Sequence, residues 1–306
     1  MQATKTSFNK WALYLGILPA VLFYVVMNLG PSIATFVLSF TDITGTPGVP
    51  WKFIGIANYK EFFFIQNPRD TMMVLKNTVI FCLLVTFVQN AIALPIAVVL
   101  NNKFIKGRNF YRAVVFLPVV LGVMVTSLTW LLMFNPTDGP VSQLIGIFGL
   151  SSNFFADKET ALYYVIFCQI WMAMGYSMVI NLAGLQGIPT ELYEAGEIDG
   201  TTGNQAFRYI TFPMLWPTIA VNITLALIGS LSSFQIILFT ASGGLNIFTQ
   251  TMAMRVMYFA FNLNAGMNTF SMRQGFGAAV AMMLFVFILI VTLVSHYVTN
   301  RREMEA

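Results

Sequence analysis

Six apolar stretches alternate with polar segments along this chain of 306 residues. A helix needs about 20 apolar residues to cross the hydrocarbon core of a bilayer, and inside lipid it satisfies every backbone hydrogen bond internally. The pattern therefore predicts an all-α integral membrane protein with six transmembrane helices and both termini on the same side. We place the six helices within residues 11–40, 77–100, 113–134, 161–185, 214–240 and 275–298.

The segments between the apolar stretches indicate how the chain is organised. Residues 1–76 hold the first helix and an outer connector, residues 77–300 form the main transmembrane domain, and residues 301–306 are a tail. Two aromatic stretches near residues 53–63 and 254–261 are too short to span a membrane. They are typical of helices that lie at the membrane surface, where aromatic side chains are enriched.

The basic residues bear on the sidedness of the chain. The connector 101–112 holds Lys103, Lys106, Arg108 and Arg112 without a single acid. Short loops that are rich in Lys and Arg stay on the cytoplasmic side. This density favours cytoplasmic termini, although the total numbers of basic residues on the two sides are nearly equal.

Composition excludes several classes of function. Only 9% of the residues are charged, against about 25% in a soluble domain, and a net charge of +4 gives no reason to expect a nucleic-acid partner. The sequence has no phosphate-binding G-x-x-x-x-G-K-[ST] motif, no Ser/His/Asp set and no metal-spaced His/Cys cluster. We therefore expect neither an enzyme nor a metal site, and we expect Cys82 and Cys168, which lie in apolar stretches, to be buried free thiols.

Ionisable side chains are nearly missing from the second to sixth predicted helices, where only His296 occurs. Carriers that run on a proton or sodium gradient usually place such a group inside the membrane. If the chain takes part in transport, we expect the energy to come from another protein.

The connector between the fourth and fifth helices, residues 188–213, is polar and helix-forming. Thr190 is predicted to cap a first short helix, Gly200 and Gly203 interrupt it, and a second short helix follows from about residue 204. Two short helices at an angle would form a compact docking element, whereas the plainer alternative is a solvated connector. Four acids and one base lie here: Glu191, Glu194, Glu197, Asp199 and Arg208.

Small and polar residues occur in both helices that flank this connector. On the fifth helix they recur at i, i+4, i+7, i+8 and i+11, which is the spacing of one helical face. That face suits a cavity for a hydroxyl-rich solute, or else a packing surface of small residues. The residues are Asn222, Ala226, Gly229, Ser230 and Ser233 on the fifth helix, with Gly175, Tyr176, Ser177 and Asn181 on the fourth.

The connector also carries a motif. Glu194-Ala195-Gly196, three residues, Gly200, nine residues and Ile210-Thr211-Phe212-Pro213 resembles the EAA loop of binding-protein-dependent ABC importer permeases. Gly196 replaces the second alanine and Phe212 replaces a leucine, but the spacing is intact. The flanking segments are similar to those of the maltose-type and glycerol-phosphate-type permeases: 53–59, 111–113, 116–118, 192–195, 198–200, and Thr240 with Gly243-Gly244.

This resemblance implies a type I ABC importer permease with a cytoplasmic loop that forms two coupling helices. These would dock on an ATPase through Glu194, Ala195, Gly196, Asp199 and Gly200. The resemblance also implies that solute contacts come from the helices beside the loop. The candidate pathway residues are Gly175, Tyr176, Asn181, Asn222, Ala226, Gly229, Ser230 and Ser233.

The implied assembly lies in a bacterial or archaeal plasma (inner) membrane. It comprises a second permease, two cytoplasmic ABC ATPase subunits, and an extracytoplasmic binding protein that delivers a sugar or oligosaccharide. This chain would bind no cofactor, since ATP and Mg are used by the ATPase subunits. Three alternatives stay open: a glycerol-phosphate or other small polar cargo, an ion-coupled secondary carrier, and a membrane protein that only mediates interactions.

Overall fold

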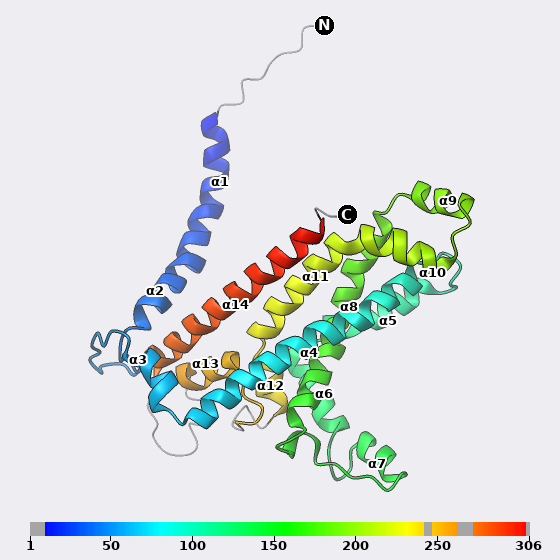
Figure 1. Ribbon diagram of the computed structural model, residues 1–306. Coiled ribbons are helices and arrows are strands. Elements are labelled where there is room, and N and C mark those ends of the chain that lie inside the picture. Colours follow the sequence, from blue (N-terminus) through cyan, green and yellow to red (C-terminus); the bar gives the residue numbers. More distant parts are fainter. Residues whose placement is uncertain (1–9, 242–246, 262–271, 304–306) are drawn as a thin grey trace.

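The computed structural model describes residues 10–241, 247–261 and 272–303 (Figure 1). Within these residues, five helices are long and apolar enough to cross a membrane. The first crossing combines α1 (Lys10–Tyr24), the π-turn η1 (Val25–Leu29) and α2 (Gly30–Leu38). The second, fourth and sixth are α4 (Pro68–Asn101), α8 (Ala161–Gln186) and α14 (Gln274–Glu303). The fifth runs without interruption through α10 (Gly203–Ala206), η4 (Phe207–Thr211) and α11 (Phe212–Ser232).

The third crossing is a broken helix, which corrects the single span predicted at residues 113–134. Its two parts are α5 (Arg108–Val120) and α6 (Val123–Met133), and they are bent by 99° relative to each other. The break has a local cause, because Leu121 and Gly122 are both extended, with ψ angles of 133° and 145°. Two successive extended residues cannot continue an α-helix. Counted as one crossing, the pair brings the total to the predicted six.

The fifth crossing also differs from the predicted range 214–240. It begins about ten residues earlier, so the second short helix expected in the connector is the first part of the crossing itself. At the other end α11 stops at Ser232, because Ser233 is extended with ψ 119°, and a separate helix, α12 (Gln235–Thr240), follows. The docking element therefore has one independent helix, α9 (Thr190–Ile198), and one helix that is continuous with the membrane span.

The bundle is built around α8, which packs against α4, α5 and α11, while α14 packs against α11 and α13 (Met252–Phe261). The core at the end of the bundle away from α9 contains aromatic and branched residues such as Phe81, Phe154 and Ile166. A second core towards α9 contains Ala93, Met178 and Leu215. Cys82 and Cys168 are buried free thiols, as predicted.

Short helices occupy the connectors at the end of the bundle away from α9 (Figure 1). Both aromatic stretches are helical, as α3 (Ala57–Lys60) with η2 (Glu61–Ile65) and as α13, whose first residues are buried; their location at the membrane surface stays a prediction. Arg273, directly before α14, donates two hydrogen bonds of 2.6 Å to the carboxylate of Glu61. That bidentate pair holds the pKa of Glu61 below its usual value. Two further short helices, α7 (Pro140–Gly146) and η3 (Phe154–Ala156), precede α8.

The beginning of α1, the end of α14 and α9 all lie towards one end of the bundle (Figure 1). The first crossing leans away from the other helices, and none of its most apolar stretch is buried. Only its lower part, α2, packs against α14.

Candidate functional site

The coupling element, residues 188–213, begins at a proline. Pro189 occupies the N-cap position of α9 with ψ 133°, and no side chain caps the helix. The prediction of Thr190 as the cap was therefore wrong, because Thr190 is already the first helical residue. Ile188, 7% exposed, is buried in the core beside Leu185 and Leu215, which fixes where the element leaves the membrane span.

Gly200 ends α9 and turns the chain back. Its φ of +77° is the left-handed conformation that favours glycine. The Gly200 amide donates to the Glu197 carbonyl at 3.1 Å, and the Thr201 amide donates to the Gly196 carbonyl at 2.9 Å. Together these bonds form a Schellman motif. The helix interruption predicted at Gly200 is thus a helix-terminating turn.

The next helix starts immediately after this turn. Thr202 is its N-cap and forms a capping box with Gln205, whose side-chain oxygen accepts a 2.8 Å hydrogen bond from the Thr202 amide. A capping box satisfies two backbone donors at once. The reversal between α9 and the fifth crossing is therefore short and has few free backbone groups.

Gly196 shows how α9 is held against the fifth crossing. It is buried, and a Cβ atom there would lie 2.9 Å from Thr201 Oγ1 and 3.0 Å from Ile210 Cδ1. The glycine at this motif position is therefore matched by close packing of Thr201 and Ile210. A second link joins the Tyr193 hydroxyl to Thr211 Oγ1 at 3.0 Å.

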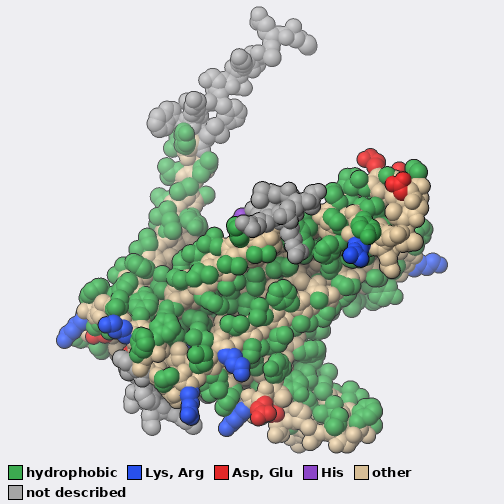
Figure 2. Space-filling model, in the orientation of Figure 1, with side chains coloured by type: hydrophobic (Ala, Val, Ile, Leu, Met, Phe, Trp, Pro, Cys, Tyr) green, Lys and Arg blue, Asp and Glu red, His purple; other side chains and the backbone are tan. Residues whose placement is uncertain are grey.

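The outer surface of the element is exposed and acidic. Glu191, Glu194, Glu197 and Asp199 are all exposed, and acidic side chains gather at this tip of the molecule (Figure 2). Ala195 is exposed as well, and Ile198 beside it is 87% exposed. Of the five predicted coupling residues, four face solvent and Gly196 supports them from inside.

A cavity of about 190 Å³ lies between α4, α8 and α11. It brings together five of the eight predicted pathway residues: Tyr176, Asn222, Ala226, Gly229 and Ser230. Two of its lining residues, Gln89 and Gln169, were not among the predicted site residues. Their signal in the sequence was a long side-chain amide inside an apolar span, which must find a hydrogen-bond partner there.

Hydrogen bonds fix the amide groups around this cavity. Gln89 Nε2 donates to Ser177 Oγ at 2.6 Å, and Asn222 Nδ2 donates to the Ser177 carbonyl at 3.0 Å. The Oδ1 atom of Asn222 is buried and has no hydrogen-bond partner in the described structure. An unsatisfied buried acceptor costs about 1–3 kcal/mol. A solute hydroxyl that entered the cavity could donate to it.

The other three predicted pathway residues lie elsewhere. Gly175 faces α5, where a Cβ atom would come within 2.5 Å of the Val115 carbonyl oxygen, so it serves helix packing. Asn181 is buried on α8 and does not line the cavity. Ser233 lies past the end of α11, and its hydroxyl donates to Gln169 Oε1 at 3.2 Å. The motif residues Gly243 and Gly244 fall outside the described residues.

Comparison with known proteins decides between the interpretations left open. Residues 91–304 match the family described as binding-protein-dependent transport system inner membrane component. The chain belongs to this family. It is a multi-pass permease of the inner membrane, and the family is one of transport proteins, not enzymes. The predicted ABC importer permease is confirmed, and the ion-coupled carrier is not favoured.

Two relatives and one solved structure illustrate the likeness. The trehalose/maltose transport system permease protein MalF of Thermococcus litoralis is 31% identical over 284 residues, which cover 92% of this chain and 91% of that protein. The sn-glycerol-3-phosphate transport system permease protein UgpA of Agrobacterium fabrum is 31% identical over 263 residues, covering 84% and 87%. A chain from the crystal structure of a bacterial alginate ABC transporter, in complex with an alginate pentasaccharide-bound periplasmic protein, matches with a TM-score of 0.81 and 21% identity. This match covers 95% of this chain and 94% of that one, and it supports the fold.

Proposed function

We propose that this permease forms one half of the translocation pathway of an ATP-driven importer for a neutral sugar or oligosaccharide. The observation that carries the proposal is the cavity between α4, α8 and α11. It is lined by neutral amides, two serine hydroxyls and Tyr176, and none of its lining residues is charged. Such groups can exchange hydrogen bonds with sugar hydroxyls, while the tyrosine ring offers an apolar face to a sugar ring.

The fifth crossing provides the mechanical link between this cavity and the coupling element. The helix Gly203–Ser232 has 30 residues and is about 45 Å long. Its first turns belong to the coupling element, and its later turns carry Asn222 and Gly229 into the cavity wall. A movement imposed on the coupling element would therefore reach the cavity through one continuous helix.

The energy for this movement would come from partner proteins. We propose that two ABC ATPase subunits grip α9 and the start of the fifth crossing, and that a second permease completes the pathway. An extracytoplasmic binding protein would deliver the sugar. ATP and Mg would bind to the ATPase subunits alone, and the difference in ATP affinity between their open and closed states would drive the switch.

Glycerol phosphate is the second candidate cargo, because one relative is named for it. A phosphate inside the cavity would be a desolvated anion, and burying an unpaired charge is costly. Neither Lys nor Arg lines this cavity. The chemistry of the lining therefore supports a neutral solute over an anionic one.

The coupling role is tested by reconstituting the permease with its ATPase, permease and binding-protein partners in liposomes. Uptake of a labelled saccharide should fall to the background of empty liposomes for Glu194→Lys, because the change reverses the charge of the motif residue on the exposed face. Glu191→Lys reverses the charge of a neighbouring exposed acid outside the motif and should retain most of the uptake. Unaltered uptake by Glu194→Lys would refute the coupling role.

A further inference from the structure

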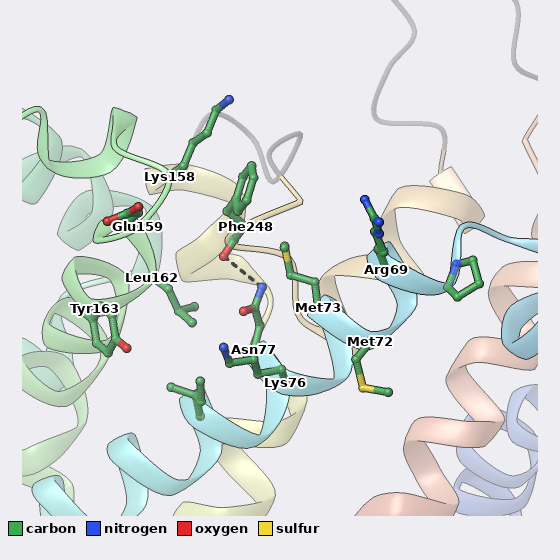
Figure 3. Close-up of a pocket in the computed structure, with 12 residues that line it drawn as sticks. Arg69, Met72, Met73, Lys76, Asn77, Lys158, Glu159, Leu162, Tyr163 and Phe248 are labelled. Carbon is green, nitrogen blue, oxygen red and sulfur yellow. Dashed lines mark hydrogen bonds between the residues drawn. The ribbon is translucent and has the colours of Figure 1, made fainter.

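A second and larger cavity, of about 660 Å³, opens at the far end of the bundle from the coupling element. It lies between the beginning of α4, the beginning of α8 and the segment that carries Phe248 (Figure 3). The amide of Asn77 donates to the backbone carbonyls of residues 247, 248 and 250 at 3.2, 2.9 and 3.1 Å. These bonds fix one wall of the cavity.

The rim of this cavity is basic. Arg69, Lys76 and Lys158 line it together with one acid, Glu159. Within the described part of the chain, none of the three cations forms an ion pair. The Lys158 ammonium lies 5.6 Å from the centre of the Phe248 ring, and Arg69 extends towards the same side of the cavity as Lys158 (Figure 3). Three cations against one carboxylate favour an anionic ligand.

The floor of the cavity is apolar and continues down the membrane-facing surface. Met72, which lines the cavity, is 66% exposed, and Tyr163 opposite is 53% exposed. The same stripe of α4 goes on below the cavity with Leu83 at 46% and Phe87 at 56% exposure. An exposed apolar stripe on a transmembrane helix is suited to hydrocarbon chains.

The length of α4 sets the depth of the cations. Its 34 residues make a helix about 51 Å long, whereas the hydrocarbon core is about 30 Å thick. Arg69, Asp70 and Lys76 lie in the first turns of α4, and charged side chains avoid the hydrocarbon core, so we expect this end of the long helix to extend into the headgroup region. Arg69 and Lys76 are seven residues apart, so they span about 10 Å of that region, with the apolar stripe directly beneath them.

We propose that this cavity binds an anionic phospholipid of the outer leaflet. Its phosphate would lie at the rim near Arg69 and Lys158, Lys76 on the other side of the cavity would add to the attraction, and its acyl chains would follow the exposed stripe of α4. A soluble protein that approaches from above could meet Arg69 and Lys158, but it could not cover a floor that descends along the membrane. A phospholipid matches both the basic rim and the apolar floor of the cavity.

The full-length chain in zwitterionic detergent can be titrated with phosphatidylglycerol or phosphatidylcholine while native mass spectrometry counts the bound lipids. Phosphatidylglycerol should bind in preference. The triple variant R69Q/K76Q/K158Q should weaken its binding by about tenfold or more, since each cation contributes to the attraction. A matched triple variant at the opposite end of α4, K103Q/K106Q/R108Q, should leave it unchanged. Glu159→Gln should strengthen binding, because it removes the acid of the rim. A gain in affinity cannot come from misfolding, so this variant tests the role of charge independently of any folding defect in R69Q/K76Q/K158Q.

Three results would overturn the proposal. Equal phosphatidylglycerol affinity in both triple variants would show that the cavity is not the site. Equal retention of the two lipids would show that the charge of the headgroup does not matter. Displacement of the lipid by millimolar inorganic phosphate alone, or loss of binding-protein docking without any loss of lipid by R69Q/K76Q/K158Q, would assign the cations to another ligand.

Discussion

Gly200 is the residue on which the geometry of the coupling element depends most directly. Its left-handed φ of +77° means that Gly200→Ala should destabilise the turn by about 1 kcal/mol. Gly203→Ala is the matched control, because its φ is not in that region and no atom lies near the added Cβ. Hydrogen–deuterium exchange on the full-length chain should be faster at Thr201 in Gly200→Ala only. Equal protection in the two variants would contradict the role of the turn.

The ion pair between Glu61 and Arg273 gives a pH-dependent stability at the other end of the molecule. Arg273 lowers the pKa of Glu61 below its ordinary value of 4.5. The carboxylate therefore stabilises the fold above that value, and this contribution is lost as the pH falls through the lower pKa of the folded state. We expect Glu61→Gln to lower the thermal stability at pH 7, with the difference from the parent shrinking below about pH 4. A difference that persists unchanged at pH 3 would argue against an ionic origin.

At the scale of residues, the sequence predicts positions whose role is set locally and misses those set by tertiary contacts. Gly200 could be predicted because a turn after a short helix requires a particular backbone conformation. The roles of Gly175 and Gln89 could not be predicted. Small and polar residues in an apolar helix give the same sequence pattern whether they pack against another helix or line a cavity. The α5 backbone lies against Gly175, and the cavity lies against Gln89.

At the scale of helices, Gly175 and Gly229 have different roles. Gly175 lets two helices pack closely, whereas Gly229 lines the cavity. A Cβ atom at Gly175 would lie 2.5 Å from a backbone carbonyl of α5, whereas at Gly229 it would meet nothing within 4 Å. Gly175→Ala should force α5 away from α8 and destabilise the fold by about 1–3 kcal/mol. Gly229→Ala should not destabilise the helix, because alanine favours helix by up to about 1 kcal/mol. It should, however, narrow the cavity and alter uptake.

Thermal unfolding in detergent, with uptake measured in parallel, tests this pair of variants. The prediction requires Gly175→Ala to lose stability and Gly229→Ala to lose uptake at parental stability. If both variants unfold at the parental temperature, the close approach of α5 to α8 is not structurally required. If Gly229→Ala transports normally, the wall at Gly229 is not part of the pathway.

The hydropathy pattern predicted which membrane helices exist, but it did not predict where they begin, break and end. The break between α5 and α6 at Leu121 and Gly122 lies inside an apolar run, where hydropathy does not change. The fifth crossing begins at Gly203 because the polar residues of the connector form a helix that joins it directly. Hydropathy assigns such residues to a loop, although the backbone is continuous.

At the scale of the whole molecule, the first crossing is the membrane span that its own bundle covers least. None of the most apolar stretch of Tyr14–Leu38 is buried, compared with 56% for the corresponding stretch of Ala161–Gln186. Some of that surface contacts lipid in any membrane protein. A crossing that leans away from its own bundle leaves room for another helix between them, which agrees with the second permease that we propose.

The continuity of the fifth crossing leads to a prediction about the assembled transporter. The π-turn Phe207–Thr211 lies between the coupling end and the cavity, and a π-turn holds one residue more than the α-helix. Such a turn absorbs its extra residue without rotating the helix beyond it, so the register has to be changed in the regular α-helix that follows. Deleting Val221 of α11, which is 55% exposed, should rotate the coupling end by about 100° relative to the cavity wall at Asn222 and Gly229. The permease should still insert and fold, but ATP hydrolysis should no longer drive uptake.

Val221→Ala is the control for this deletion, because it shortens the same side chain without changing the helical register. Uptake and ATP hydrolysis should be measured together in the reconstituted transporter. The deletion should abolish uptake, while Val221→Ala should retain most of it. Normal uptake by the deletion would mean that the coupling end and the cavity move independently, and that the continuous helix does not transmit the signal.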